Sequence, residues 1–235
     1  MEIFRHQDKN IVDIIREKKN LVFVGEAGSG KSEVAINIAT KIAEGKFGKC
    51  RGVDLFDMDQ TKPLFRTRDL SEKLSSCGVN VYYQEQYLDA PSVVGGVNNS
   101  LMSDKYTILD IGGGQQAAKV VGVYNHLLRG EDSEVIYILN PYRPWTRSSE
   151  GIAGTLSHIL RSIRLDGVYL LSNPNLGRET DINDFLSGLD EIDKILGEVA
   201  RCNSACVTDK LFEDASRLTD KQLIPITKFL TYEWE

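Results

Sequence analysis

The sequence predicts a single α/β domain with a mostly parallel central sheet and helices on both faces. Short runs rich in β-branched residues alternate with helix-like segments, and several of these runs are apolar almost throughout. Crossover helices join parallel strands, and strands that are covered on both faces lose the alternation of polar and apolar residues. The 235 residues, 41% of them hydrophobic, suffice for one core, so we expect residues 1–235 to form one domain.

The expected elements follow from these runs and from helix boundary signals. Gly78 and Gly130 are expected to end helices, and Ser148 or Ser149 and Thr180 or Asp181 to begin them. The expected strands are Leu21–Val24, Val53–Phe56, Val79–Tyr83, Tyr106–Ile111, Glu134–Leu139 and Gly167–Leu171, with a last one near Leu223–Leu230. The expected helices are Ile11–Lys19, Lys31–Glu44, Phe65–Ser76, Gln115–Leu128, Ser149–Ile163 and Asp181–Glu198.

The strongest motif is a phosphate-binding loop, G-x-x-x-x-G-K-S, between an apolar strand and a helix. Its glycines let the backbone curl so that N–H groups point at phosphate oxygens, and the positive end of the helix adds to that field. Lys31 would place a charge on the phosphates, and the Ser32 hydroxyl would ligate Mg²⁺. An ordinary glycine-rich turn is the alternative. The expected nucleotide-binding residues here are Gly25, Glu26, Ala27, Gly28, Ser29, Gly30, Lys31, Ser32 and Glu33.

Acidic residues follow two further strands. Asp57 and Asp59 come at the end of the second strand, and Asp110 ends the fourth. Ligands of open α/β sheets sit beyond the carboxyl ends of the strands, so these carboxylates are expected to support Mg²⁺, with Asp59 orienting an attacking water. A solvated acidic turn is the alternative for the first pair.

Three glycines at 112–114 follow Asp110. They would let a loop approach the terminal phosphate, with Gly112 and Gly113 as contacts, unless they form only a structural turn. Asn173, in an Asn-Pro turn after a later strand, is equally consistent with a base contact and with a plain turn. Arg143 and Arg147 lie in another turn that follows a strand. Contact with phosphate or with a partner is one interpretation of these two residues, and ordinary surface arginines, which we favour, are the other.

These motifs together resemble the MinD/ParA/CobQ-like nucleotide-binding proteins of the SIMIBI class, over roughly residues 20 to 200 and in the same order along the chain. GEAGSGKS is similar to their phosphate loop, FDMDQTKP to their switch I, and LDIGGG to their switch II. The resemblance implies a three-layer P-loop NTPase fold. It also implies that Asp59 positions water, Asp110 supports magnesium, Gly112 or Gly113 senses the terminal phosphate, and Asn173 lies in the base-binding turn.

One position departs from the family pattern. Most members carry an extra lysine after the first glycine of the loop, whereas this chain has Glu26. An acid there would repel a triphosphate. We therefore do not expect the mechanism of the resembled family in which this lysine reaches across a dimer to the partner's nucleotide, although dimerisation itself is compatible with Glu26. Metalloenzyme-assisting GTPases also lack that lysine, but the segment from Asn173 lacks the lysine and aspartate of their guanine motif, so ATP is favoured.

The leading hypothesis is therefore an ATP- and Mg²⁺-dependent ATPase switch, with Lys31 and Asp59 as catalytic residues, that acts on a protein partner, for instance in cofactor or metal-centre maturation. One alternative is an ATP-dependent kinase or ligase of the dethiobiotin or cobyrinic acid type, whose acceptor would lie near Pro91 and Gly95–Gly96. A metallochaperone-like GTPase and a nucleotide-gated binding module with little turnover are two more.

Charge and composition limit the kinds of partner that we expect for this protein. The formal net charge of −6 and a C-terminus without a basic cluster argue against DNA binding and against a membrane-binding basic helix. A secretory signal and a 20-residue apolar run are both missing from the sequence, so we expect a cytoplasmic protein. A nucleotide-dependent homodimer is compatible with the resemblance.

Four cysteines, Cys50, Cys77, Cys202 and Cys206, are expected to be reduced. The last two are four residues apart and would share one face of a helix, either as a metal or redox pair or, as we favour, as small packed residues.

Overall fold

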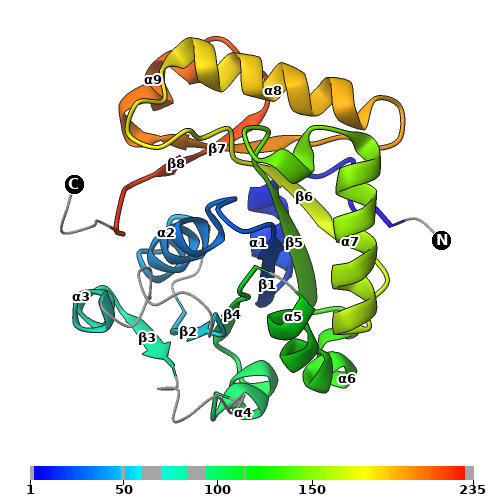
Figure 1. Ribbon diagram of the computed structural model, residues 1–235. Helices are drawn as coiled ribbons and strands as arrows, with labels where there is room; N and C mark the ends of the chain where they lie inside the picture. Colours follow the sequence, from blue (N-terminus) through cyan, green and yellow to red (C-terminus); the bar gives the residue numbers. More distant parts are fainter. Residues whose placement is uncertain (1–2, 49–50, 60–69, 84–93, 114, 231–235) are drawn as a thin grey trace.

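The computed structural model describes residues 3–48, 51–59, 70–83, 94–113 and 115–230. They form one eight-stranded sheet in the order β3-β2-β4-β1-β5-β6-β7-β8 (Figure 1). Its neighbouring strands pair in parallel, which confirms the predicted fold class. The strands are β1 (Asn20–Gly25), β2 (Val53–Asp57), β3 (Val79–Tyr82), β4 (Tyr106–Asp110), β5 (Ser133–Leu139), β6 (Tyr169–Ser172), β7 (Ser204–Thr208) and β8 (Gln222–Ile226).

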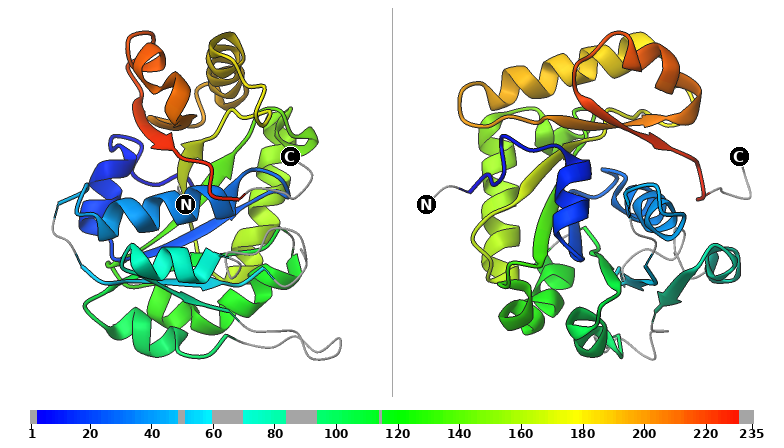
Figure 2. Two further views of the ribbon diagram at one scale, coloured as in Figure 1. Left: turned by 90° about the vertical axis from the view of Figure 1, so that its left-hand side faces the viewer. Right: turned by 180° about the vertical axis from the view of Figure 1, so that it is seen from behind.

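Helices cover both faces of this sheet and give a three-layer architecture (Figure 2). The first face carries α1 (Ile11–Glu17), α2 (Lys31–Ala43) and α3 (Ser71–Ser76). The second carries α4 (Val97–Met102), α5 (Gln115–Val121), α6 (Asn125–Leu128) and α7 (Ser149–Ile163). The remaining helices, α8 (Ile182–Leu196) and α9 (Phe212–Ser216), pack against β7 and β8.

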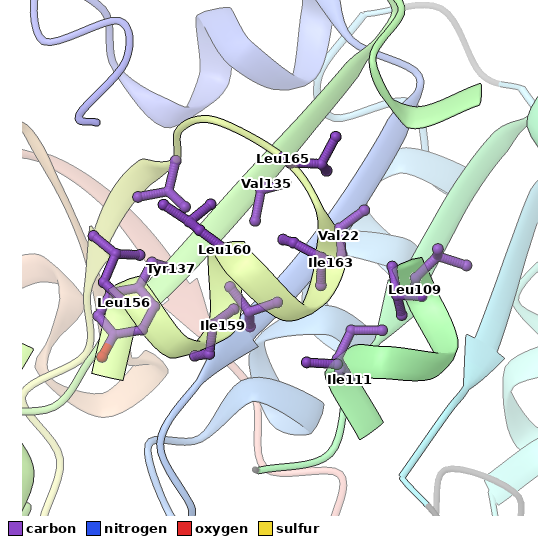
Figure 3. Packing of buried hydrophobic residues seen from close by; sticks show 14 of the residues in the cluster. Val22, Leu109, Ile111, Val135, Tyr137, Leu156, Ile159, Leu160, Ile163 and Leu165 are labelled. Atoms are coloured by element: carbon purple, nitrogen blue, oxygen red, sulfur yellow. The ribbon is translucent and has the colours of Figure 1, made fainter. Parts of the chain in front are cut away.

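The core between α7 and the sheet shows why the central strands read as apolar runs. Leu156, Ile159 and Ile163 of α7 pack on side chains of β1 and β5, among them Val22 and Tyr137 (Figure 3). Residues Asn20–Gly25 of β1 are all buried, because α2 covers the other face of the same strand. Burial of each such side chain contributes about 1.5–3 kcal/mol, which holds β1 firmly at the centre of the sheet.

Several predicted helix boundaries are confirmed. The Ser148 side chain caps α7 by accepting from the Gly151 N–H. Asp181 caps α8 in a reciprocal pair with Asp184. Gly78, with φ 85°, ends the helix before β3. The predicted helix at residues 115–128 is interrupted by a 3₁₀ turn at Gly122–Tyr124. A Cβ on Gly122 would lie 2.5 Å from the Ser162 carbonyl oxygen, so glycine permits α7 to approach there.

The prediction that Cys202 and Cys206 share a helix face is wrong. Cys206 lies in β7, a five-residue strand that the sequence analysis missed, and Cys202 precedes it. Both thiols are buried and unpaired, and burial raises the pKa of Cys202 to about 11, which suits packed residues rather than a redox pair. The described part of the chain contains no cluster of three His, Cys, Asp or Glu residues that could hold a metal.

Some predictions fall outside the described residues: Cys50, Pro91, Gly114 and the first part of the helix expected at 65–76. The short helices α4 and α9 were not predicted. Among the described helices, none has the length and apolar character that crossing a bilayer requires.

Candidate nucleotide-binding site

The predicted phosphate loop connects β1 to α2 at the carboxyl edge of the sheet, next to its centre (Figure 1). Gly28 and Gly30 have φ values of 76° and 92°, a region that other residues rarely occupy. At Gly25, a Cβ would lie 2.7 Å from the carbonyl oxygen of Ile138 on β5. The glycine spacing of the motif is thus required by the backbone path.

Two side chains hold carbonyl oxygens of this loop. The Lys31 ammonium donates to the Glu26 carbonyl at 2.9 Å. From the end of β6, the Asn173 amide donates to the Ser29 carbonyl at 2.7 Å. Because a trans peptide directs its C=O and the next N–H in opposite directions, fixing the Ser29 carbonyl also fixes the direction of the Gly30 N–H. The structure therefore places Asn173 on the loop backbone.

A third contact comes from Arg143, which the sequence analysis interpreted as a surface residue. Its Nε donates to the Gly28 carbonyl at 2.8 Å. Arg143 follows β5, the strand beside β1. The rule that ligand sites collect the loops after neighbouring strands was the one signal in the sequence that could have indicated this residue.

Two predicted binding residues in the first turn of α2, Ser32 and Glu33, have different surroundings. Ser32 is partly exposed next to the loop. The Glu33 carboxylate instead accepts hydrogen bonds from the backbone N–H groups of Phe229 and Leu230, at 2.6 and 3.1 Å. Burial raises the pKa of Glu33, although these two N–H donors oppose the shift. Glu33 thus holds the C-terminal segment.

The three predicted acids lie together at the carboxyl ends of β2 and β4. Asp57 and Asp110 are register partners on adjacent strands, and Asp110 is also in register with Phe23 of β1. Asp59 follows β2, and its N–H donates to the Asp57 carboxylate at 3.0 Å. All three side chains are buried. Carboxylate oxygens are the hard donors that Mg²⁺ prefers, but among the described residues these three acids do not by themselves form a cluster that could hold a metal, so a Mg²⁺ ion here would need further ligands.

The glycines after β4 touch both the acids and the loop. A Cβ on Gly112 would lie 2.5 Å from Oδ1 of Asp59. A Cβ on Gly113 would lie 2.9 Å from the backbone nitrogen of Ala27. Contacts this close leave no room for a larger residue, so the glycines let this segment lie against the phosphate loop. The predicted contact of Gly112 and Gly113 with a terminal phosphate stays a prediction.

Comparison with solved structures identifies this arrangement at the level of fold. The chain matches FtsY from Mycoplasma mycoides with a TM-score of 0.50 and 13% identity, over 83% of this chain and 62% of that one. It matches the cell division protein ftsY from Thermotoga maritima with a TM-score of 0.56 and 17% identity, over 88% of this chain and 67% of that one. The chain has the fold of FtsY. No protein-family model and no curated protein sequence matches it.

The FtsY fold confirms the predicted three-layer P-loop fold, whereas membership of the SIMIBI class stays a prediction. At these identities the likeness shows the fold alone. Membership of the MinD/ParA/CobQ group, the choice of ATP and the roles of the site residues stay predictions.

Glu26 is the acidic residue of the phosphate loop. Burial raises the pKa of the Tyr137 hydroxyl, and the negative charge of Glu26 raises it further. Tyr137 is a fully buried residue of β5. The acid that replaces the expected lysine is therefore close enough to β5 to act electrostatically on it.

Proposed function

We propose that this chain is a cytoplasmic, Mg²⁺-dependent P-loop ATPase that acts as a nucleotide-dependent switch on a partner protein. The observation that supports it most strongly is the contact of the loop after β4 with the phosphate loop, through Gly113 and Ala27. Gly112 of the same segment contacts Asp59. A terminal phosphate entering between these loops would displace them, and its release would let them return.

The buried polar residues supply the chemistry. Lys31 would exchange the Glu26 carbonyl for phosphate oxygens, and Asp59 would orient the attacking water. Ser32, Asp57 and Asp110 would hold Mg²⁺ together with the phosphates. When bound, this ion draws negative charge from the phosphate oxygens. A nucleotide-dependent homodimer is compatible with a phosphate loop that lies at the carboxyl ends of the strands.

The test is calorimetric titration of Mg²⁺-ATP and Mg²⁺-GTP, with phosphate release followed in the same samples. Lys31→Ala should weaken binding at least about a hundredfold, because the ammonium is the loop's own cation. Lys46→Ala, at an exposed position after α2, is the matched control. Selective ATP binding that only Lys31→Ala abolishes supports the proposal, preference for GTP favours the metallochaperone-like GTPase, and binding of neither contradicts both.

One cavity favours a second candidate, an ATP-dependent kinase or ligase of the dethiobiotin or cobyrinic acid type. It has a volume of about 340 Å³ and is lined by residues that include Gly96, Ser100 and the buried Asp54. Gly96 belongs to the segment that the sequence analysis considered as an acceptor cradle. ADP release that depends on an added small-molecule acceptor would support this candidate, whereas release that depends on a copurifying protein would support the switch.

A further inference from the structure

The turn after β5 holds the backbone of Arg143 in one position. The Arg143 N–H donates to the Asn140 carbonyl at 3.1 Å, and the Arg143 carbonyl accepts from the Thr146 N–H at 3.1 Å and from its hydroxyl at 2.9 Å. Asn140 is buried, and its carboxamide oxygen accepts from the Tyr142 N–H. Arg143 is thus presented by a closed, internally hydrogen-bonded turn.

Neighbouring elements fix this turn in the fold. The Asn140 amide donates to the Asn175 carbonyl at 2.8 Å, which joins the turns after β5 and β6. The Tyr142 hydroxyl donates to the Asp184 carbonyl in the first turn of α8. The backbone from which the Arg143 side chain extends is thus held from two sides.

The Arg143 side chain ends on the phosphate loop. Besides the hydrogen bond to the Gly28 carbonyl, the guanidinium lies where a side chain on Gly28 would be, since a Cβ there would lie 3.3 Å from Nε and 3.5 Å from Cζ. Arg147 lies four residues further along the same connection. It is exposed, and within the described residues it makes no such contact with the loop.

The charges around the loop bear on the role of the contact between Arg143 and Gly28. Within the loop, the negative charge of Glu26 formally cancels the positive charge of Lys31. Three buried aspartates lie on the β4 side. A nucleotide would bring more negative charge into this surrounding, so a further cation beside the loop would stabilise its binding.

We infer that Arg143 supplies, from the β5 side, a second positive charge that adds to that of Lys31 when the phosphate loop binds nucleotide phosphates. This inference rests on the proposed nucleotide-binding function. The hydrogen bond to Gly28 positions the guanidinium, and the charge acts on the phosphates through the short distance across the loop. Because charge acts here, a neutral side chain that can still donate a hydrogen bond does not replace it.

The experiment separates charge from hydrogen bonding with Arg143→Gln and Arg143→Lys. Gln keeps an amide donor and loses the charge, while Lys keeps the charge and loses the guanidinium geometry. Arg147→Gln is the matched control. The dissociation constant for Mg²⁺-ATP is measured by calorimetry at ionic strengths of about 0.05 M and about 0.5 M, where screening differs strongly. Thermal unfolding without nucleotide monitors the fold of each variant.

At low ionic strength, Arg143→Gln should bind Mg²⁺-ATP about tenfold more weakly than wild type, and Arg143→Lys within about threefold of it. At high ionic strength the difference in Mg²⁺-ATP affinity between Arg143→Gln and wild type should shrink. Salt screens the attraction between the Arg143 charge and the phosphates, but it does not remove the effect of a purely structural hydrogen bond. Equal affinities for Arg143→Gln and Arg147→Gln overturn the inference, as does a deficit that salt does not change. If wild type itself binds no nucleotide, the proposed function fails first, which the Lys31→Ala comparison distinguishes.

Discussion

The two strands beside β1 bring different chemistry to the same loop. On the β4 side, the loop is approached by glycines and by buried carboxylates, with Gly113 against Ala27. On the β5 and β6 side, it is held by side-chain donors, Arg143 and Asn173, on two of its carbonyl oxygens. Hydrogen bonds fix a backbone, whereas a close contact with glycine can be released. Under the proposed function, we expect the β5 and β6 side to maintain the shape of the loop and the β4 side to respond to what binds in it.

The largest effect is expected on the glycine side. Gly113→Ala would place a Cβ 2.9 Å from the backbone nitrogen of Ala27, so one of the two loops must shift. A displacement of this kind should lower phosphate release by roughly tenfold to a hundredfold, and it should also cost about 1–3 kcal/mol of unfolding free energy because the overlapped atoms belong to the backbone. Gly154→Ala, an exposed position on α7 with no atom near the added Cβ, is the control. Unchanged phosphate release in Gly113→Ala would contradict a responsive β4 side.

A smaller effect, on stability, is expected on the hydrogen-bonded side. Asn173→Ala removes the donor to the Ser29 carbonyl and should lower the free energy of unfolding by about 1–3 kcal/mol. Chemical denaturation measures it, with Asn98→Ala on an exposed face of α4 as the control. Equal stabilities for the two variants would mean that the β6 side does not hold the loop.

The smallest effect concerns Glu33, next to the loop on α2. Burial raises its pKa above the ordinary 4.5, so the folded protein binds this proton more tightly than the unfolded chain does. The stability that this group contributes is therefore present below about pH 4.5 and is lost as pH rises through the folded-state pKa. Relative to Glu33→Gln, wild type should lose unfolding free energy as pH rises from about 4.5 through the folded-state pKa of Glu33.

Denaturation curves across this range measure the difference, and Glu44→Gln at the exposed end of the same helix is the matched control. Parallel pH profiles for wild type and Glu33→Gln would contradict the assignment of Glu33 to a buried contact with the C-terminal segment.

Most of the fold could be predicted because its signals are local. Apolar runs identified every strand from β1 to β6, and side-chain caps at Ser148 and Asp181 marked two long helices. The strand β7 was missed because Ser204–Thr208, with the sequence SACVT, is short and its own Cys206 lies at a helix-like spacing from Cys202. Its burial comes from packing against β8 and α8, which local pattern does not reveal.

Only part of the candidate site could be predicted from the sequence. The phosphate loop and the acids after β2 and β4 are encoded by contiguous motifs, and the structure brings them to one edge of the sheet. The contacts of Arg143 and Glu33 are set by tertiary structure. Arg143 reaches a carbonyl 115 residues away in sequence, and Glu33 reaches N–H groups 196 and 197 residues away. Neither partner is visible in a local pattern.

The strand order has a consequence for synthesis of the chain. β1 is made first, yet its neighbours in the sheet are β4 and β5, and the latter ends only at Leu139, beyond the middle of the 235 residues. On the ribosome, the buried residues of β1 therefore wait for β4 until Asp110 and for β5 until Leu139 has been translated. Pairing between strands so distant in sequence is slow, and unpaired apolar strands attract chaperones or aggregate. The loop that emerges among the first segments is thus among the last to take its shape.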